Sequence, residues 1–318
     1  MKKVVISELN WSNGNDLLEK SGCRVVYDPD LWKRIDELKL ELKDADALIV
    51  RNQTQVNASL ISEAGKLKVI GRLGVGLDNI HLSELQKRGI SVVYAKNANA
   101  VSVAEYVLSA IFLTARRLEK ASEDVKKGGW NRKLFTGKEI YGKTLGLIGI
   151  GEIGHRVAVR AQSIGMRVIG YDPFVSSYDF PIAETGIQLK GRDEVLAESD
   201  YISLHVPLTP ETKYLINDRS LSLMKSNAVL INTSRGGVVD EHALALALET
   251  GRIAAAILDV LEQEPPSADH PLMRLDNCIL TPHIAGLTEQ SQERISQMIA
   301  EEVLRELNGV TSLCRVKM

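Results

Sequence analysis

The stretch Thr144–Gly154 reads TLGLIGIGEIG, an apolar run that leads directly into three closely spaced glycines. Gly149, Gly151 and Gly154 have the spacing G-x-G-x-x-G, and His155–Ile164 continues with apolar residues at helical intervals. The first glycine permits a tight turn, the second lets a pyrophosphate approach the backbone, and the third lets the helix pack close to the strand. The N-terminus of that helix would direct unpaired N–H groups at the phosphates. The stretch therefore predicts a doubly wound α/β domain that binds a dinucleotide.

An acidic residue ends the next expected strand. Asp172 follows Met166–Tyr171 and comes eighteen residues after Gly154. A carboxylate at this place is expected to accept a hydrogen bond from a ribose 2′-hydroxyl, and its charge would repel a 2′-phosphate. The following Pro173–Val175 contains no arginine that could hold such a phosphate. We therefore predict NAD rather than NADP as the cofactor.

Short apolar runs alternate with longer amphipathic stretches on both sides of this turn, which predicts two parallel sheets covered by helices. The expected strands before it are Val4–Ile6, Arg24–Tyr27, Ala47–Val50, Val69–Gly71 and Ile90–Tyr94. The expected strands from the turn onward are Thr144–Ile148, Arg167–Tyr171, Tyr201–His205, Ala228–Asn232, Ala255–Leu258 and Cys278–Thr281.

Helical periodicity is clearest in Ser102–Lys126, where Ser102 with Glu105 three residues later has the pattern of a capping box. Arg34–Leu42, Ala58–Ala64 and Gln290–Leu307 are the other helical candidates. The segment Val175–Glu184 combines Ser, Tyr, Asp and Pro, and we predict a loop there.

Composition excludes several classes of protein. The chain has 318 residues, enough for two domains of about 150 residues each. Its formal net charge is −2 and its aromatic content is 5%, so a nucleic-acid binder or an anionic-membrane binder is disfavoured. No apolar run approaches the roughly 20 residues of a transmembrane helix. The three cysteines, Cys23, Cys278 and Cys314, lack the spacing of a zinc site or a disulfide framework, so we expect no metal and a reducing cytoplasm.

Residues that could do chemistry follow three of the expected strands, at the edge where doubly wound sheets bind ligands. Arg235 stands before two glycines, and its planar fork suits a carboxylate beside a carbonyl; the alternative is a surface arginine. The segment after the expected strand Ala255–Leu258 offers three carboxylates as candidates, those of Asp259, Glu262 and Glu264.

His283 lies between Pro282 and Gly286 after the last strand, which makes it a candidate general acid and base; the alternative is a structural histidine. His205 is expected to line the cofactor site without transferring a proton. The remaining histidines have less suitable helical or loop contexts: His81, His155, His242 and His270.

Together these motifs resemble the D-isomer-specific 2-hydroxyacid dehydrogenase family over nearly the whole chain. The segments that carry the resemblance are Gly71–Asn79, Thr144–Gly154, His205–Thr209, Asn232–Gly237, Leu258–Pro265 and Thr281–His283. The resemblance implies two Rossmann-like or flavodoxin-like domains with a cleft between them. It implies a discontinuous substrate-binding domain of residues 1–98 and 287–318, an NAD-binding domain of residues 99–286, and a homodimer with Ser102–Lys126 as a main contact.

The resemblance also implies the roles of individual residues. Arg235 would hold the carboxylate and carbonyl of the substrate, His283 would transfer the proton, and Glu264 would orient His283. Because the formate dehydrogenase branch has Gln at that place, Glu264 disfavours that branch. The implied cofactor-binding residues are Gly149, Gly151, Glu152, Ile153, Gly154, Asp172, His205, Val206, Pro207, Thr212, Thr233, Ser234, Arg235, Asp259, His283 and Gly286. The implied substrate-binding residues are Arg51, Asn52, Leu73, Gly74, Val75, Gly76, Arg235 and His283.

The identity of the hydroxy acid is less sharply indicated. Asp46–Thr54 and Gly128–Gly137 look most like the 3-phosphoglycerate dehydrogenase branch. Arg51, Arg72 and Arg132 are then candidates to hold a distal anion, with surface arginines as the alternative.

Other assignments remain open. Gln53 stands where some members of that branch have a basic residue, so sulfolactate oxidation and the reduction of hydroxypyruvate or glyoxylate remain alternatives. An NAD(H)-sensing corepressor-like protein is the alternative outside enzymes. A regulatory domain after the catalytic core is not expected.

Overall fold

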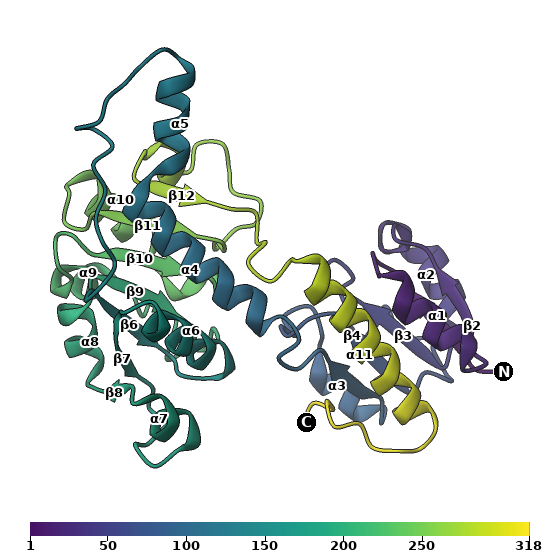
Figure 1. Cartoon of the computed structure of the whole chain (residues 1–318). Coiled ribbons are helices and arrows are strands. Elements are labelled where there is room, and N and C mark those ends of the chain that lie inside the picture. The colour runs from purple at the N-terminus through teal and green to yellow at the C-terminus, as the bar shows by residue number, and fades with distance from the viewer. Residues whose placement is uncertain (318) are drawn as a thin grey trace. The chain divides into compact units, whose positions relative to one another are not determined.

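The computed structural model describes residues 1–317 and divides into two compact units (Figure 1). Unit 1 consists of Met1–Asn99 together with the segment from Leu287 onward, and unit 2 consists of Ala100–Gly286. Met318, the last residue of the expected discontinuous domain, lies outside the described residues. Both units are parallel sheets flanked by helices, which confirms the predicted fold class.

Unit 1 contains a five-stranded parallel sheet in the order β2-β1-β3-β4-β5. Its strands are β1 (Lys3–Ile6), β2 (Arg24–Tyr27), β3 (Ala47–Val50), β4 (Val69–Arg72) and β5 (Ser91–Tyr94). Its helices are α1 (Ser12–Lys20), η1 (Leu31–Lys33), α2 (Ile35–Leu42), α3 (Leu82–Lys87) and α11 (Glu289–Leu307).

Both faces of this sheet are buried, which explains why its strands are almost continuously apolar. Val5 and Leu48 belong to the hydrophobic cluster that includes α2 and α3, whereas Val4 and Ile49 belong to the cluster that includes α1 and α11. Figure 1 shows α1 beside α11 on their face of the sheet. The chain therefore completes unit 1 only when α11 returns from the far end of the sequence.

Unit 2 contains a seven-stranded parallel sheet in the order β12-β11-β10-β9-β6-β7-β8. Its strands are β6 (Thr144–Ile148), β7 (Arg167–Tyr171), β8 (Gln188–Leu189), β9 (Tyr201–Leu204), β10 (Val229–Asn232), β11 (Ala255–Leu258) and β12 (Cys278–Leu280). Its helices are α4 (Ala100–Arg116), α5 (Leu118–Lys126), α6 (Glu152–Ser163), α7 (Phe180–Thr185), α8 (Arg192–Glu198), α9 (Asp218–Leu223), η2 (Gly236–Val238), α10 (Glu241–Glu249) and η3 (Pro271–Arg274). One face packs on α4 and α6 and the other on α8, α9 and α10.

The single helix expected over Ser102–Lys126 is wrong. Arg117 has a φ of 49°, in the left-handed region, and separates α4 from α5. Since α4 already begins at Ala100, Ser102 is a buried helical residue and not the predicted cap. No residue of α5 is buried, and Figure 1 shows α5 and the segment after it extending away from the sheet of unit 2.

Two shorter predictions also fail. Ala58–Ala64 forms successive turns in place of a helix, because Asn57 Oδ1 accepts the Leu60 N–H and local bonds replace a helical ladder. The loop expected over Val175–Glu184 contains most of α7, which begins after Asp179 and ends at a left-handed glycine.

No helix in residues 1–317 combines the length and the apolar character needed to cross a bilayer.

Candidate active site

The glycine-rich turn after β6 has a distinct steric reason for each glycine. Gly149 has a φ of 94°, and a Cβ there would lie 2.5 Å from the carbonyl oxygen of His205. A Cβ on Gly154 would lie 2.4 Å from the carbonyl oxygen of Gly149, so α6 can approach the turn only without a side chain. A Cβ on Gly151, by contrast, would meet no atom within 4 Å. The backbone at Gly151 is therefore open to a ligand, at the point where α6 begins.

Asp172 is fixed beside this turn at the end of β7. Its Oδ2 accepts a hydrogen bond from Ile150 N–H and its Oδ1 accepts one from Phe174 N–H, both at 2.9 Å. Each carboxylate oxygen can still accept a further bond. The open backbone at Gly151, the first turn of α6 and this carboxylate fit the diphosphate and ribose of a dinucleotide.

His205 follows β9 and faces the glycine turn from the neighbouring strand. Its Nε2 lies 3.0 Å from Ser203 Oγ. Burial lowers the pKa of His205 to about 4. The imidazole is therefore neutral near pH 7.

The other expected cofactor residues follow β9 and β10. The hydroxyl of Thr212 donates to the carbonyl oxygen of Pro207 at 2.6 Å, which fixes the segment after β9. Ser234 donates to Asn232 Oδ1 through both its N–H and its hydroxyl. The structure thus brings the ends of β6, β7, β9 and β10 to one edge of the sheet, because parallel strands share their carboxyl ends.

Arg235 begins the tight turn after β10. Its Nη1 donates to the carbonyl oxygen of Ser234 at 2.7 Å, and its own carbonyl accepts from Asn232 Nδ2. A Cβ on the next residue, Gly236, would lie 1.9 Å from the carbonyl carbon of Leu261. The turn that presents Arg235 is therefore packed directly on the backbone that follows β11.

Glu264 and His283 are in hydrogen-bond contact between the segments after β11 and β12. His283 Nδ1 lies 2.8 Å from Glu264 Oε2, and Glu264 Oε1 accepts the Leu261 N–H at 3.1 Å. Burial opposes ionisation of Glu264, but its bonds and the charges of His283 and Arg235 hold the pKa of that carboxyl below its usual value. The structure therefore brings two of the three expected catalytic side chains into direct contact.

Asp259 supports the segment that presents His283. It is 1% exposed, and its carbonyl oxygen accepts the His283 N–H at 2.9 Å. Its Oδ1 accepts from Ile284 N–H and from the hydroxyl of Thr281, and its Oδ2 accepts from Ala285 N–H. His283 itself has a φ of 56°. These bonds hold His283 in its left-handed conformation.

The expected substrate segment in unit 1 is organised by a residue to which sequence reasoning gave no role. Glu8 is 2% exposed and lies just after β1. Its two carboxylate oxygens accept four backbone N–H groups from the segment 51–54, at 2.8–3.1 Å. An acidic residue at the carboxyl end of a buried parallel strand was the available signal. Glu8 thereby fixes the backbone of Arg51 and Asn52.

The guanidinium of Arg51 lies 6.0 Å from the ring centroid of Trp11. Burial lowers the pKa of Arg51, and the charge of Glu8 opposes that shift. A half-buried cation on an aromatic face suits an anionic group.

The second expected substrate segment, Leu73–Gly76, follows β4. Arg72 bends back onto it, and its Nη1 donates to the carbonyl oxygen of Leu73 at 2.7 Å. Gly74 has a φ of 149°. Arg72 thus supports this turn, whereas Arg132 is an exposed residue of unit 2.

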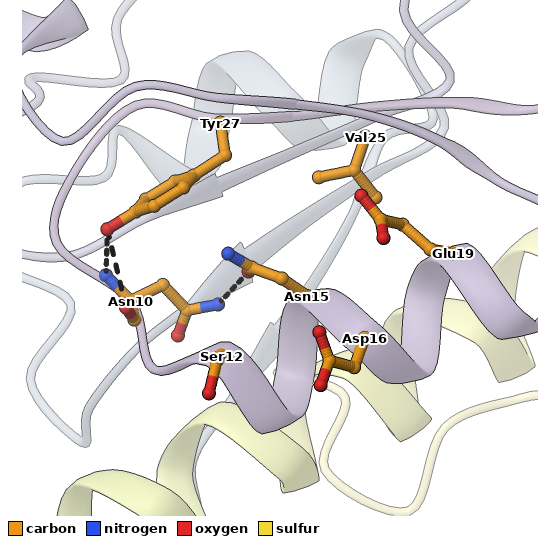
Figure 2. Close-up of a pocket in the computed structure, with 7 residues that line it drawn as sticks. All are labelled: Asn10, Ser12, Asn15, Asp16, Glu19, Val25 and Tyr27. Atoms are coloured by element: carbon orange, nitrogen blue, oxygen red, sulfur yellow. Dashed lines mark hydrogen bonds between the residues drawn. The ribbon is translucent and has the colours of Figure 1, made fainter.

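A polar hollow of about 490 Å³ lies beside α1 in unit 1, and Figure 2 shows the side chains that line it. The residues that line it are Asn10, Ser12, Asn15, Asp16, Glu19, Val25 and Tyr27. It contains two carboxylates, no cationic side chain and none of the expected site residues, so it does not suit an anionic substrate.

No cluster of three or more His, Cys, Asp or Glu side chains suited to a metal ion occurs within the described chain.

Comparison with known proteins places this arrangement in a family. Residues 108–285 match the model of the NAD binding domain of D-isomer specific 2-hydroxyacid dehydrogenases. The chain is 43% identical over 311 residues to a D-3-phosphoglycerate dehydrogenase of Methanocaldococcus jannaschii, covering 97% of this chain and 58% of that relative. The chain therefore spans little more than half the length of the phosphoglycerate dehydrogenases that it matches.

Two further relatives are matched over nearly their full length. A hydroxypyruvate reductase of Thermotoga maritima is 42% identical, with 92% of this chain and 97% of the relative covered. The crystal structure of a D-lactate dehydrogenase of Aquifex aeolicus, complexed with NAD and lactic acid, is 32% identical, with a TM-score of 0.82 and coverage of 97% and 96%. The chain belongs to the D-isomer specific 2-hydroxyacid dehydrogenase family, which confirms the resemblance seen in its sequence.

Proposed function

We propose that the protein interconverts a small D-2-hydroxy acid and its 2-oxo acid with NAD. The observation that carries the proposal is the Glu264–His283 pair, held beside the Arg235 turn at the carboxyl ends of β10, β11 and β12. A dinucleotide-binding turn follows β6 in the same sheet. Unit 2 is proposed as the cofactor-binding domain and unit 1 as the substrate-binding domain.

His283 is the proposed proton-transfer group. Because Nδ1 faces Glu264, Nε2 is the nitrogen left for the substrate oxygen. An ionised Glu264 stabilises the imidazolium that forms when a hydroxy acid gives up its proton. Arg235 would hold the carboxylate beside the reacting carbon. NAD, when bound, supplies the hydride acceptor.

A His283→Gln variant tests this role. It should lose at least about a hundredfold in kcat, because general acid–base catalysis typically contributes 10²–10⁴-fold. Its dissociation constant for NADH should change little. A variant that turns over at the wild-type rate would show that His283 is not the proton-transfer group.

The preference for NAD over NADP is proposed from Asp172 and the open backbone at Gly151. A 2′-phosphate would meet the Asp172 carboxylate, which is fixed in place by two backbone N–H groups. An Asp172→Ala variant should therefore lower the NAD/NADP ratio of kcat/KM. An unchanged ratio contradicts the assignment. Glu152, Ile153, Val206, Thr233 and Gly286 remain proposed cofactor contacts.

The proposed substrate class is a 2-hydroxy acid with a distal anion, with 3-phosphoglycerate favoured. Its support is the half-buried Arg51 guanidinium on the Trp11 ring, in a segment fixed by Glu8. Hydroxypyruvate, glyoxylate and sulfolactate are the alternatives, because Gln53 adds no second cation beside Arg51.

Turnover of phosphohydroxypyruvate, sulfopyruvate, hydroxypyruvate and glyoxylate with NADH decides among them. An Arg51→Gln variant should raise KM for phosphohydroxypyruvate and sulfopyruvate, which carry a distal anion. It should leave KM for glyoxylate unchanged. Tight NADH binding without turnover of any oxo acid would instead favour an NAD(H)-sensing protein.

A homodimer is proposed from apolar side chains on and after α5. Leu118, Val125, Trp130 and Leu134 are 50–76% exposed, which is unusual for large apolar residues gathered on one segment. Light scattering after gel filtration should give twice the chain mass, and Trp130→Ser with Leu134→Ser should shift it to the monomer. A monomeric wild type contradicts this proposal.

A reducing, cytoplasmic setting is proposed because Cys23, Cys278 and Cys314 are free thiols. Cell fractionation tests it.

A further inference from the structure

One buried carboxylate outside the proposed catalytic set closes the loop that carries Glu264. Glu241 is the first residue of α10 and is 5% exposed. Its Oε1 accepts the Glu262 N–H at 2.8 Å, and its Oε2 lies 2.9 Å from Nε2 of His270. Glu264 lies between these two points in the sequence. A single carboxylate therefore holds both ends of the segment Glu262–His270.

The same segment is fixed from two further directions. The peptide between Leu261 and Glu262 packs against Gly236, where a Cβ would lie 2.2 Å from the Glu262 nitrogen. The Leu261 N–H donates to Glu264 Oε1 while the Glu262 N–H donates to Glu241. Consecutive N–H groups thus bind the carboxylate that contacts His283 and the carboxylate that anchors the loop.

The surroundings of His270 indicate what its ring contributes. Its side chain is 16% exposed, and Nδ1 is buried with no hydrogen-bond partner among residues 1–317. Nε2 must carry a hydrogen to donate to Glu241. A histidine with one ring nitrogen buried and unsatisfied is a poor choice for packing alone. Among the described residues, the side chain of His270 makes one hydrogen bond, to Glu241, and that bond is therefore its contribution.

We propose that Glu241 and His270 are positioning residues, which keep Glu264 on Nδ1 of His283. This inference rests on the function proposed above. Glu241 is joined to the Arg235 turn through five intervening residues, and its carboxylate reaches across to the Glu264 loop. The pair therefore sets the geometry between the group that binds the substrate carboxylate and the group that orients the proton-transfer residue. A misplacement of about 1 Å at such a group can cost about a hundredfold in rate.

The test is a Glu241→Gln variant with Glu249→Gln as its matched control. Glu249 is an exposed residue at the other end of α10. Glu241→Gln should lower kcat about 10–100-fold, while KM for the oxo acid and the dissociation constant for NADH stay within about twofold. Glu249→Gln should match the wild type. In a Glu264→Gln background, Glu241→Gln should cause little further loss, because the residue through which it acts is already removed.

Substitution of His270 provides a second, independent test of the same proposal. His270→Phe removes the donor and the unsatisfied nitrogen together, so it should keep the fold and lose kcat as Glu241→Gln does. His270→Gln restores a donor and should recover part of that loss.

The outcomes separate the inference from the proposed function. An active wild type whose folded Glu241→Gln and His270→Phe variants keep kcat within about twofold overturns the inference and leaves the function standing. The inference is also overturned if Glu241→Gln lowers kcat by the same factor in the Glu264→Gln background as in the wild type. If Glu241→Gln does not fold, His270→Phe decides by the same criterion. A wild type that reduces no 2-oxo acid refutes the proposed function, and the inference with it.

Discussion

Replacement of Glu8 by glutamine tests whether one buried carboxylate holds the segment 51–54. Its Oε1 accepts the N–H groups of Arg51 and Thr54 at 2.8 and 2.9 Å. Its Oε2 accepts those of Gln53 and Asn52 at 2.9 and 3.1 Å. In glutamine one oxygen becomes an NH₂ group, so either orientation of the amide leaves two backbone N–H groups facing a donor.

The expected cost follows from those two lost bonds. A hydrogen bond to a buried charged group contributes about 1.5–3 kcal/mol, so Glu8→Gln should reduce the free energy of unfolding of unit 1 by about 3–6 kcal/mol. The control is Glu19→Gln, at an exposed residue of α1, which should stay within about 0.5 kcal/mol.

The effect is isolated by urea unfolding measured by tryptophan fluorescence in a Trp130→Phe background. The two tryptophans that remain, Trp11 and Trp32, both lie in unit 1, so the signal reports the unfolding of that unit. A loss below about 1 kcal/mol with an unchanged urea slope would refute the view that these four bonds fix the segment.

Three further predictions concern unit 2. Gly236→Ala should reduce kcat at least about tenfold in a steady-state assay, because the added Cβ would overlap the backbone at Leu261 and Glu262. Its control is Gly65→Ala, where the added Cβ would meet no atom within 4 Å, and this variant should match the wild type in the same assay. The neutral, half-buried His205 binds a proton less readily than its unfolded counterpart, so the stability that it contributes is present above about pH 6.5 and is lost as pH falls towards 4. When the pH is lowered from 7 to 5, the free energy of unfolding of the wild type, measured by urea titration, should therefore fall by up to about 2 kcal/mol more than that of His205→Asn. Equal losses in the two proteins would contradict the lowered pKa of His205. Asp259→Asn should lower kcat more than it raises KM, since an amide cannot accept all three bonds that hold the His283 segment; kinetic constants unchanged from the wild type would show that those bonds are dispensable.

The sequence by itself predicted most strands to within a residue at each end. Runs such as Ala47–Val50 and Thr144–Ile148 are buried on both faces, and a continuous apolar run is what that environment requires. It was less reliable where a single residue decides a boundary. Arg117 breaks the α4–α5 helix through its left-handed conformation, and nothing in the helical periodicity of Ser102–Lys126 predicts such a break.

The sequence also determined the chemistry that the chain carries, because a glycine turn, an arginine, a glutamate and a histidine after successive strands must meet at one edge of a parallel sheet. Only the tertiary structure decided which other polar residues hold these side chains, and the segment 51–54 of unit 1, in place. Glu8, Asp259, Glu241 and His270 bind backbone or side-chain groups that lie 21–46 residues away along the chain, with His270 and Glu241 themselves 29 residues apart. The partners of a buried carboxylate depend on which N–H groups the fold leaves unpaired beside it, and no local pattern in the sequence records that.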